Sequence, residues 1–166
     1  MVFANQFIDT DFHPIDIAEN LASHHAWDFD RITENEIALI VEGQWRTYSI
    51  TLAWSGNDEV LSVICSFDLA PPDTKLPSLF DLVNKINDQC WIGSFSFWDD
   101  QKLMAYRYGL LLAGNQIASS EQIENMIDIA VWSSERYYPA LQLLIWGNTT
   151  PSQAIQVAIA KAYGHA

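Results

Sequence analysis

Basic residues are scarce in this chain of 166 residues. Eight lysines and arginines stand against 21 aspartates and glutamates, which gives a formal net charge of -13 at pH 7. A body of this charge repels the phosphate backbone of DNA and RNA, and anionic membrane surfaces repel it for the same reason. We therefore expect neither nucleic acid nor membrane as a partner. The acidity keeps an apolar chain soluble, and it would also suit a basic protein partner.

Cysteine is also rare, and long apolar runs are missing. Cys65 and Cys90 are the two cysteines, and no metal-ligand spacing surrounds either of them. Both lie in apolar patterns, so we expect two small buried side chains. The chain has no apolar run of about 18 residues, and it does not open with a basic segment followed by an apolar one. These absences predict a cytoplasmic protein.

Motifs for catalysis are absent. The chain has no Gly-rich phosphate loop, no G-x-S-x-G or H-E-x-x-H segment and no paired C-x-x-C. Neighbouring His24 and His25 point about 100° apart on a helix, so they cannot hold one metal ion together. Turn chemistry explains Asp99 and Asp100 better than acid–base catalysis. We therefore predict a protein that is not an enzyme, with no catalytic residues, no metal and no cofactor.

Apolar and aromatic side chains are abundant. The chain is 49% hydrophobic and 13% aromatic, with seven tryptophans. This content suffices for one packed core at this length, so we expect a loose arm over residues 1–12 and a single domain over residues 13–166.

The order of patterns predicts an α+β fold. Period-two alternation marks the strands, and Pro or Ser/Thr caps mark the helix starts. The expected order is a helix from Pro14, an antiparallel meander of about four strands within 27–69, a helix after Pro71-Pro72-Asp73-Thr74, a β-hairpin of 91–98 and 103–113, a long helix within 119–147, and a short C-terminal helix from Pro151. The second helix has one apparent apolar stripe, which contains Leu76, Leu79, Phe80, Val83, Ile86 and Cys90. Trp27, Trp54, Trp91 and Trp98 are expected mostly in the core.

The expected long helix is apolar on two opposite faces. One face carries Ile123, Ile127, Ala130, Tyr137, Tyr138, Leu141 and Ile145 at helical spacing. Trp132, Leu143 and Trp146, with Ile129 at the margin, fall on the other face. One domain core needs one apolar face, so the second face predicts that another chain packs there.

Arg136 and Trp45 complete the candidate interface. Arg136 lies in the middle of the apolar helix, where it can bind a partner's carboxylate, or pair with Asp128 or Glu135 and stack on Trp132. Trp45 lies on the polar-looking face of its strand, which suits an exposed aromatic. Arg107 is interpreted as half of an internal ion pair. The candidate interface residues are Ile129, Trp132, Arg136, Leu143, Trp146 and Trp45.

Several segments of the chain resemble one known family. They are WDFDR at 27–31, EIALIVEGQW at 36–45 with Tyr48 and Trp54, LVNKIN at 82–87 followed by Trp91 and Gly93, then Phe95, Trp98, Arg107, and ERYYPALQLLIWG at 135–147 followed by Pro151 and Ala154. The chain is similar in these segments to the YbjN family, bacterial proteins labelled sensory transduction regulators. It departs from the family's usual Phe at Tyr137 and from a Gly in the turn at 100–102. The resemblance implies a fold similar to type III secretion chaperones, which are small acidic α+β homodimers that bind partner proteins, and it implies no catalytic residues.

We therefore expect a non-enzymatic, homodimeric adaptor or regulator that binds an unknown protein partner. A small-molecule sensor with an aromatic pocket and an enzyme of unrecognised type are the alternatives. A broad exposed groove would favour the adaptor, a closed apolar cavity the sensor, and polar groups converging in a deep pocket the enzyme.

Overall fold

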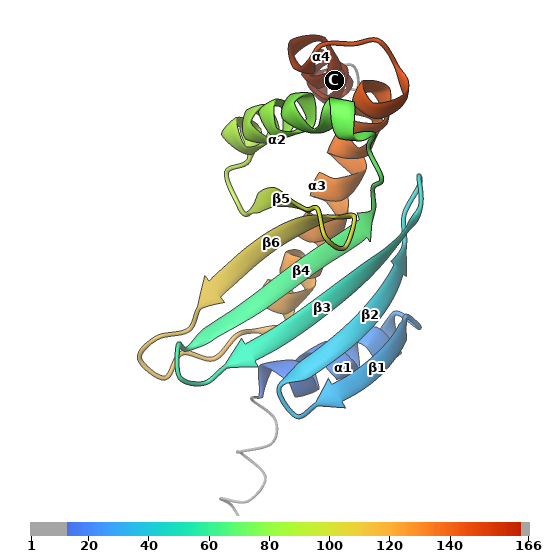
Figure 1. Cartoon of the computed structure of the whole chain (residues 1–166). Coiled ribbons are helices and arrows are strands. Elements are labelled where there is room, and N and C mark those ends of the chain that lie inside the picture. Colours follow the sequence, from blue (N-terminus) through green and yellow to red (C-terminus); the bar gives the residue numbers. More distant parts are fainter. Residues whose placement is uncertain (1–12, 164–166) are drawn as a thin grey trace, which may run out of the picture.

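The computed structural model describes residues 13–163, and their order of elements confirms the expected α+β fold (Figure 1). The expected arm over residues 1–12 lies outside the described residues. The elements are α1 (Pro14–His24), β1 (Asp28–Thr33), β2 (Glu36–Glu42), β3 (Thr47–Ser55), β4 (Val60–Asp68), the short 3-10 helix η1 (Asp73–Lys75), α2 (Leu76–Gln89), β5 (Ser94–Trp98), β6 (Leu103–Leu111), α3 (Ser120–Trp146) and α4 (Pro151–Tyr163).

The strands form one antiparallel sheet in the order β1-β2-β3-β4-β6-β5. One face of the sheet is covered by α1, which contacts β1, β2 and β3, and by α3, which contacts β4 and β6. The helices α2 and α4 pack on each other and on α3 at the upper end of the sheet (Figure 1). The long helix α3 therefore joins the layer over the sheet to the helices beyond it.

The helix ends follow from capping residues that are visible in the sequence. The Ser119 hydroxyl accepts from Gln122 N at 3.1 Å, and the Gln122 side chain accepts from Ser119 N at 2.9 Å, which is a capping box at the start of α3. Thr150 and Gln153 form the same pair at the start of α4. At the other end of α3, the Lys75 ammonium donates to the carbonyls of Leu144 and Gly147, where the helix dipole favours a cation.

The core lies between the sheet and α3. Alternate residues of β3 and β4 point toward the helices and are buried, as the period-two pattern predicts; they are Tyr48, Ile50, Leu52, Leu61, Val63, Cys65 and Phe67. The predicted inner face of α3 is buried over Ile123, Ile127, Ala130, Tyr137, Leu141 and Ile145. Tyr138 is an exception, because it is half-buried beside Phe67, with its ring centroid 5.6 Å from that of Phe67.

The predicted apolar stripe of the second helix was wrong in one position. Phe80 is 52% exposed, and Leu82 is buried in its place together with Leu79, Val83 and Ile86. The reason is the position of α2, which contacts α4 as well as α3 and β5, so its buried face is rotated toward Leu82.

Candidate functional site

A small hollow opens on the surface where the turn after α2 meets the first half of α3. Its volume is about 220 Å³. We call it the aromatic hollow and define it by Cys90, Trp91 and Ile92 from the turn, and by Ile129, Trp132, Arg136 and Tyr137 from α3. Three of the predicted interface residues, Ile129, Trp132 and Arg136, therefore meet at one place.

The turn that carries Trp91 and Ile92 is held from two sides. The Tyr106 hydroxyl donates to the Ile92 carbonyl at 2.6 Å, and the Asn87 side chain accepts from Phe95 N at 2.7 Å. Gly93 has a φ of 71°, and a Cβ there would lie 2.4 Å from the Tyr106 hydroxyl oxygen. This geometry leaves Trp91 fully exposed to solvent. The sequence-based expectation that Trp91 belongs to the core was wrong, because the strand starts only at Ser94, after this turn.

Arg136 is the charged group of the aromatic hollow. Its guanidinium carbon lies 5.4 Å from the centroid of the Trp132 ring and 5.1 Å from that of Tyr137. The predicted stacking on Trp132 is therefore present. The alternative pairing with Asp128 or Glu135 is wrong, because no carboxylate within residues 13–163 forms an ion pair with Arg136. Its Nε is buried and has no hydrogen-bond acceptor among these residues.

Glu135 instead fixes the β2–β3 turn and, with it, Trp45. The Glu135 carboxylate accepts from Gln44 N at 3.0 Å and from Trp45 N at 3.2 Å. A Cβ on Gly43 would lie 2.2 Å from this carboxylate, so the turn packs closely on α3. Trp45 is 44% exposed beside α3.

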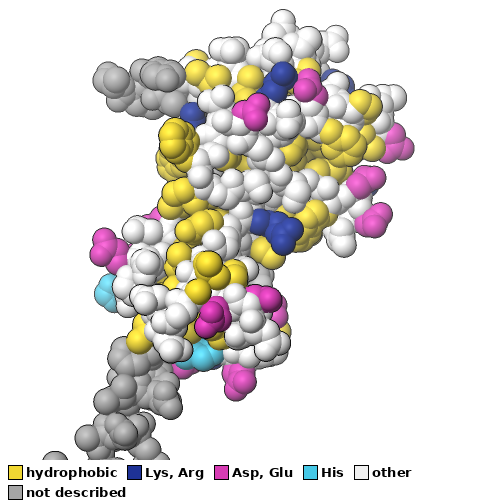
Figure 2. All heavy atoms as spheres, turned by 90° about the vertical axis from the view of Figure 1, so that its left-hand side faces the viewer, with side chains coloured by type: hydrophobic (Ala, Val, Ile, Leu, Met, Phe, Trp, Pro, Cys, Tyr) yellow, Lys and Arg dark blue, Asp and Glu magenta, His cyan; other side chains and the backbone are white. Residues whose placement is uncertain are grey.

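The side of α3 that faces away from the sheet is called its outward side. It carries Trp132 at the aromatic hollow and Leu143 and Trp146 beyond it. Trp132 is 60% exposed and Trp146 is 76% exposed, whereas Leu143 is half-buried. The two tryptophans are 14 positions apart in the helix, which corresponds to about 21 Å along its axis. Seen from the left-hand side of Figure 1, hydrophobic side chains reach the molecular surface over the upper half of the protein (Figure 2). By these exposures, the outward side of α3 carries large apolar side chains that the described part of the chain leaves in contact with solvent.

Cys90 and Tyr137, two of the residues that line the aromatic hollow, are uncharged at neutral pH. Burial raises the pKa of the Cys90 thiol and that of the Tyr137 hydroxyl above their ordinary values, so both keep their protons. The Tyr137 hydroxyl faces Cys90 but makes no hydrogen bond of good geometry within the described residues. Arg136 is therefore the one ionised group among the residues that define the hollow.

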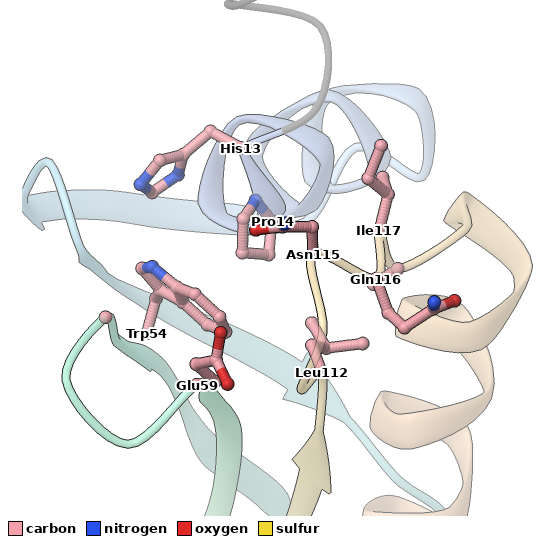
Figure 3. Close-up of a pocket in the computed structure, with 10 residues that line it drawn as sticks. His13, Pro14, Trp54, Glu59, Leu112, Asn115, Gln116 and Ile117 are labelled. Carbon is pink, nitrogen blue, oxygen red and sulfur yellow. The ribbon is translucent and has the colours of Figure 1, made fainter.

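A second hollow of about 440 Å³ lies at the start of α1 (Figure 3). Trp54 and Glu59 form one side of it, and Gln116 and Ile117 form the other (Figure 3). Its histidine has a structural role, because His13 Nδ1 accepts from Ile15 N at 3.2 Å and caps α1, while Nε2 lies 3.0 Å from Asn35 Oδ1. We therefore centre the candidate site on the aromatic hollow, where Arg136 has no carboxylate partner in the described part of the chain.

His25 and the acidic β5–β6 turn, which the sequence offers as further candidates, take part in local contacts. His25 Nε2 lies 2.5 Å from Glu124 Oε1, and its ring stacks on Trp27. Asp99 pairs with Lys102 in the β5–β6 turn. His165 lies outside the described residues. In the part of the chain from His13 to Tyr163, no three His, Cys, Asp or Glu side chains come together in a metal-binding arrangement.

Arg107 lies on the sheet face that the helices leave open. It is exposed, and its strand neighbour Tyr106 points into the core. The predicted ion pair is not formed with any carboxylate between residues 13 and 163.

Comparison with known proteins gives a family and a fold. The model of the family YbjN, described as "Putative bacterial sensory transduction regulator", matches residues 14–143. The crystal structure of YbjN from E. coli, described as "a putative transcription regulator", superposes with a TM-score of 0.51 at 12% sequence identity, over 90% of this chain and 93% of that one. No curated protein matches the chain. Among the described residues, none of the helices is long and apolar enough to cross a membrane.

Proposed function

The chain belongs to the YbjN family, and from this premise we propose that it is a non-enzymatic adaptor or regulator that binds another protein through the outward side of α3. The observation that carries the proposal is the aromatic hollow, in which exposed Trp91 and Trp132 flank an arginine without a carboxylate partner in the described chain. The family description as a regulator is consistent with a role in binding rather than catalysis.

The composition of this surface supports the proposal. Tryptophan and arginine are enriched among the residues that dominate the binding energy of protein interfaces. A contiguous apolar surface on a soluble chain marks a docking site or an aggregation hazard. The outward side of α3 combines both residue types, and the Tyr106 hydroxyl anchors the neighbouring turn with Trp91 through the Ile92 carbonyl, which lowers the cost of ordering this turn on binding.

A small-molecule sensor fits this site less well. Pockets for drug-sized ligands have volumes of roughly 300–1,000 Å³ and bury most of the ligand. The aromatic hollow measures about 220 Å³, and two of its walls are exposed tryptophans. A shallow opening of this size suits one side chain of a protein partner.

The proposal includes self-association and a cytoplasmic location. Leu143 and Trp146, which lie farther along α3 than the aromatic hollow, would form the seam between two copies, as in the homodimers that the resemblance implies. Both cysteines are free thiols, which favours a reducing compartment.

Light scattering tests the self-association. At micromolar concentration the mass should be about twice 18.8 kDa, because burying Leu143 and the exposed Trp146 between two copies removes apolar surface from water. A mass of one chain at every concentration would contradict the dimer and leave the outward side of α3 to a different protein.

A further inference from the structure

We propose that the aromatic hollow binds the C-terminal residue of a partner protein. In this proposal Arg136 binds the α-carboxylate, and Trp91, Ile92 and Trp132 surround an apolar side chain. The inference rests on the proposed function and names the chemical feature that the partner must present.

The positive charge of Arg136 would be balanced by one carboxylate of a ligand. Two other arginines of the chain have carboxylate partners. Arg31 of β1 lies 3.0 Å from Asp16 and 2.7 Å from Glu19. Arg46, just before β3, lies 3.9 Å from Asp68. Arg136 has none in the described chain, although the protein carries 21 acidic residues. A guanidinium offers a planar fork of donors that matches a carboxylate. Its stacking between Trp132 and Tyr137 holds the guanidinium in place without using those donors.

The accessible donors of the hollow belong to the guanidinium. The Tyr137 side chain is buried and its hydroxyl interacts with the Cys90 thiol, so it is not offered to a ligand. The Nε of Arg136 is buried as well, so a carboxylate in the hollow would accept from the terminal nitrogens of Arg136.

The small volume of the hollow favours a single C-terminal residue as the ligand. A volume of about 220 Å³ equals the space of about seven water molecules at about 30 Å³ each, which is the size of one apolar residue. One residue must then supply both the apolar side chain and the carboxylate, and the last residue of a protein does so. A polyacidic segment is excluded, because the net charge of -13 repels it.

Two small probes that differ only in charge test this inference. N-acetyl-leucine presents a leucine side chain and a free carboxylate, and N-acetyl-leucinamide presents the same side chain with a neutral amide. Binding is followed through the indole N–H signals of the tryptophans by NMR. In the wild-type protein the carboxylate probe should bind at least about tenfold more tightly than the amide, because a charge-assisted pair is worth at least one decade.

Variants identify the group responsible. In Arg136→Gln the two probes should bind equally and weakly. Arg107→Gln removes an exposed arginine that also has no ion pair in the described chain, and it should keep the wild-type preference. Trp91→Ala should weaken both probes by a similar factor, and it should fold because Trp91 is fully exposed.

Three outcomes would overturn the inference. They are equal affinity of both probes for the wild type, a carboxylate preference that survives in Arg136→Gln, and no indole shift with either probe at millimolar concentration. None of these outcomes would contradict the proposed protein-binding function, because cross-linking from position 132 of α3 tests that function separately.

Discussion

Replacing Leu141 with Asp will leave the chain unfolded, whereas replacing Leu143 with Asp will leave it folded. Leu141 is completely buried on the inner side of α3. A carboxylate there would be buried without a partner, at a cost of several kcal/mol, which can exceed half of a typical domain stability of about 5–15 kcal/mol. Circular dichroism of the two purified variants will show helical and sheet signals for Leu143→Asp and their loss for Leu141→Asp.

Leu143→Asp is the matched control, two residues away on the outward side. Its side chain is half-buried, and a negative charge near the end of α3 costs about 0.3–1 kcal/mol against the helix dipole. Size-exclusion chromatography should show a folded monomer if Leu143 lies in the seam between two copies. A folded dimer would move the seam elsewhere and assign the outward side of α3 to another protein. Unfolding of both variants would mean that both faces of α3 are core, or that the monomer cannot fold alone.

Stability will fall steeply as the pH rises above about 9. Burial raises the pKa of the Cys65 thiol from 9.0 to about 12 and that of the Tyr106 hydroxyl from 10.0 to about 12. Burial also raises the pKa of Tyr48 and of Tyr137. The unfolded chain therefore loses these protons first, and each proton lost only on unfolding lowers the free energy of unfolding by about 1.4 kcal/mol per pH unit.

Urea unfolding at pH 8 and pH 10.5 measures this effect. The stabilisation is complete below the unfolded pKa values and declines as the pH approaches the folded ones. Cys65 and Tyr106 alone should reduce the free energy of unfolding by about 3 kcal/mol at pH 10.5. Equal stability at the two pH values would mean that these groups are accessible to water in the folded protein.

Local signals in the sequence were enough to predict the fold. The capping boxes at Ser119 and Thr150 and the proline at position 14 place three helix starts, and the structure confirms them. The alternation of β3 and β4 identifies the buried face because side chains of a strand point to opposite sides in turn. These features depend on neighbours in the sequence, so they can be read without a structure.

The walls of the aromatic hollow were only partly predictable. Ile129 and Trp132 follow from the second apolar face of α3, but the strand alternation, extended through Gly93, wrongly predicts that Trp91 lies in the core. Gly93 was the available signal, because a glycine after two large apolar residues permits the left-handed turn that exposes them. The lack of a carboxylate near Arg136 could not be predicted, since it depends on where Glu135 is directed by the turn at Gln44.

Photo-cross-linking from position 132 shows whether the outward side of α3 contacts another protein in the cell. A benzophenone amino acid replaces Trp132 in cells of the native host, and in a matched control it replaces Ile40, an exposed apolar residue of β2 on the sheet face that the helices leave open. Position 132 should give one discrete adduct, and position 40 should give none. A mass of about twice 18.8 kDa would identify a second copy, and another mass a partner protein. No adduct from position 132, or the same adduct from both positions, would contradict the claim that the outward side of α3 is a protein-binding surface.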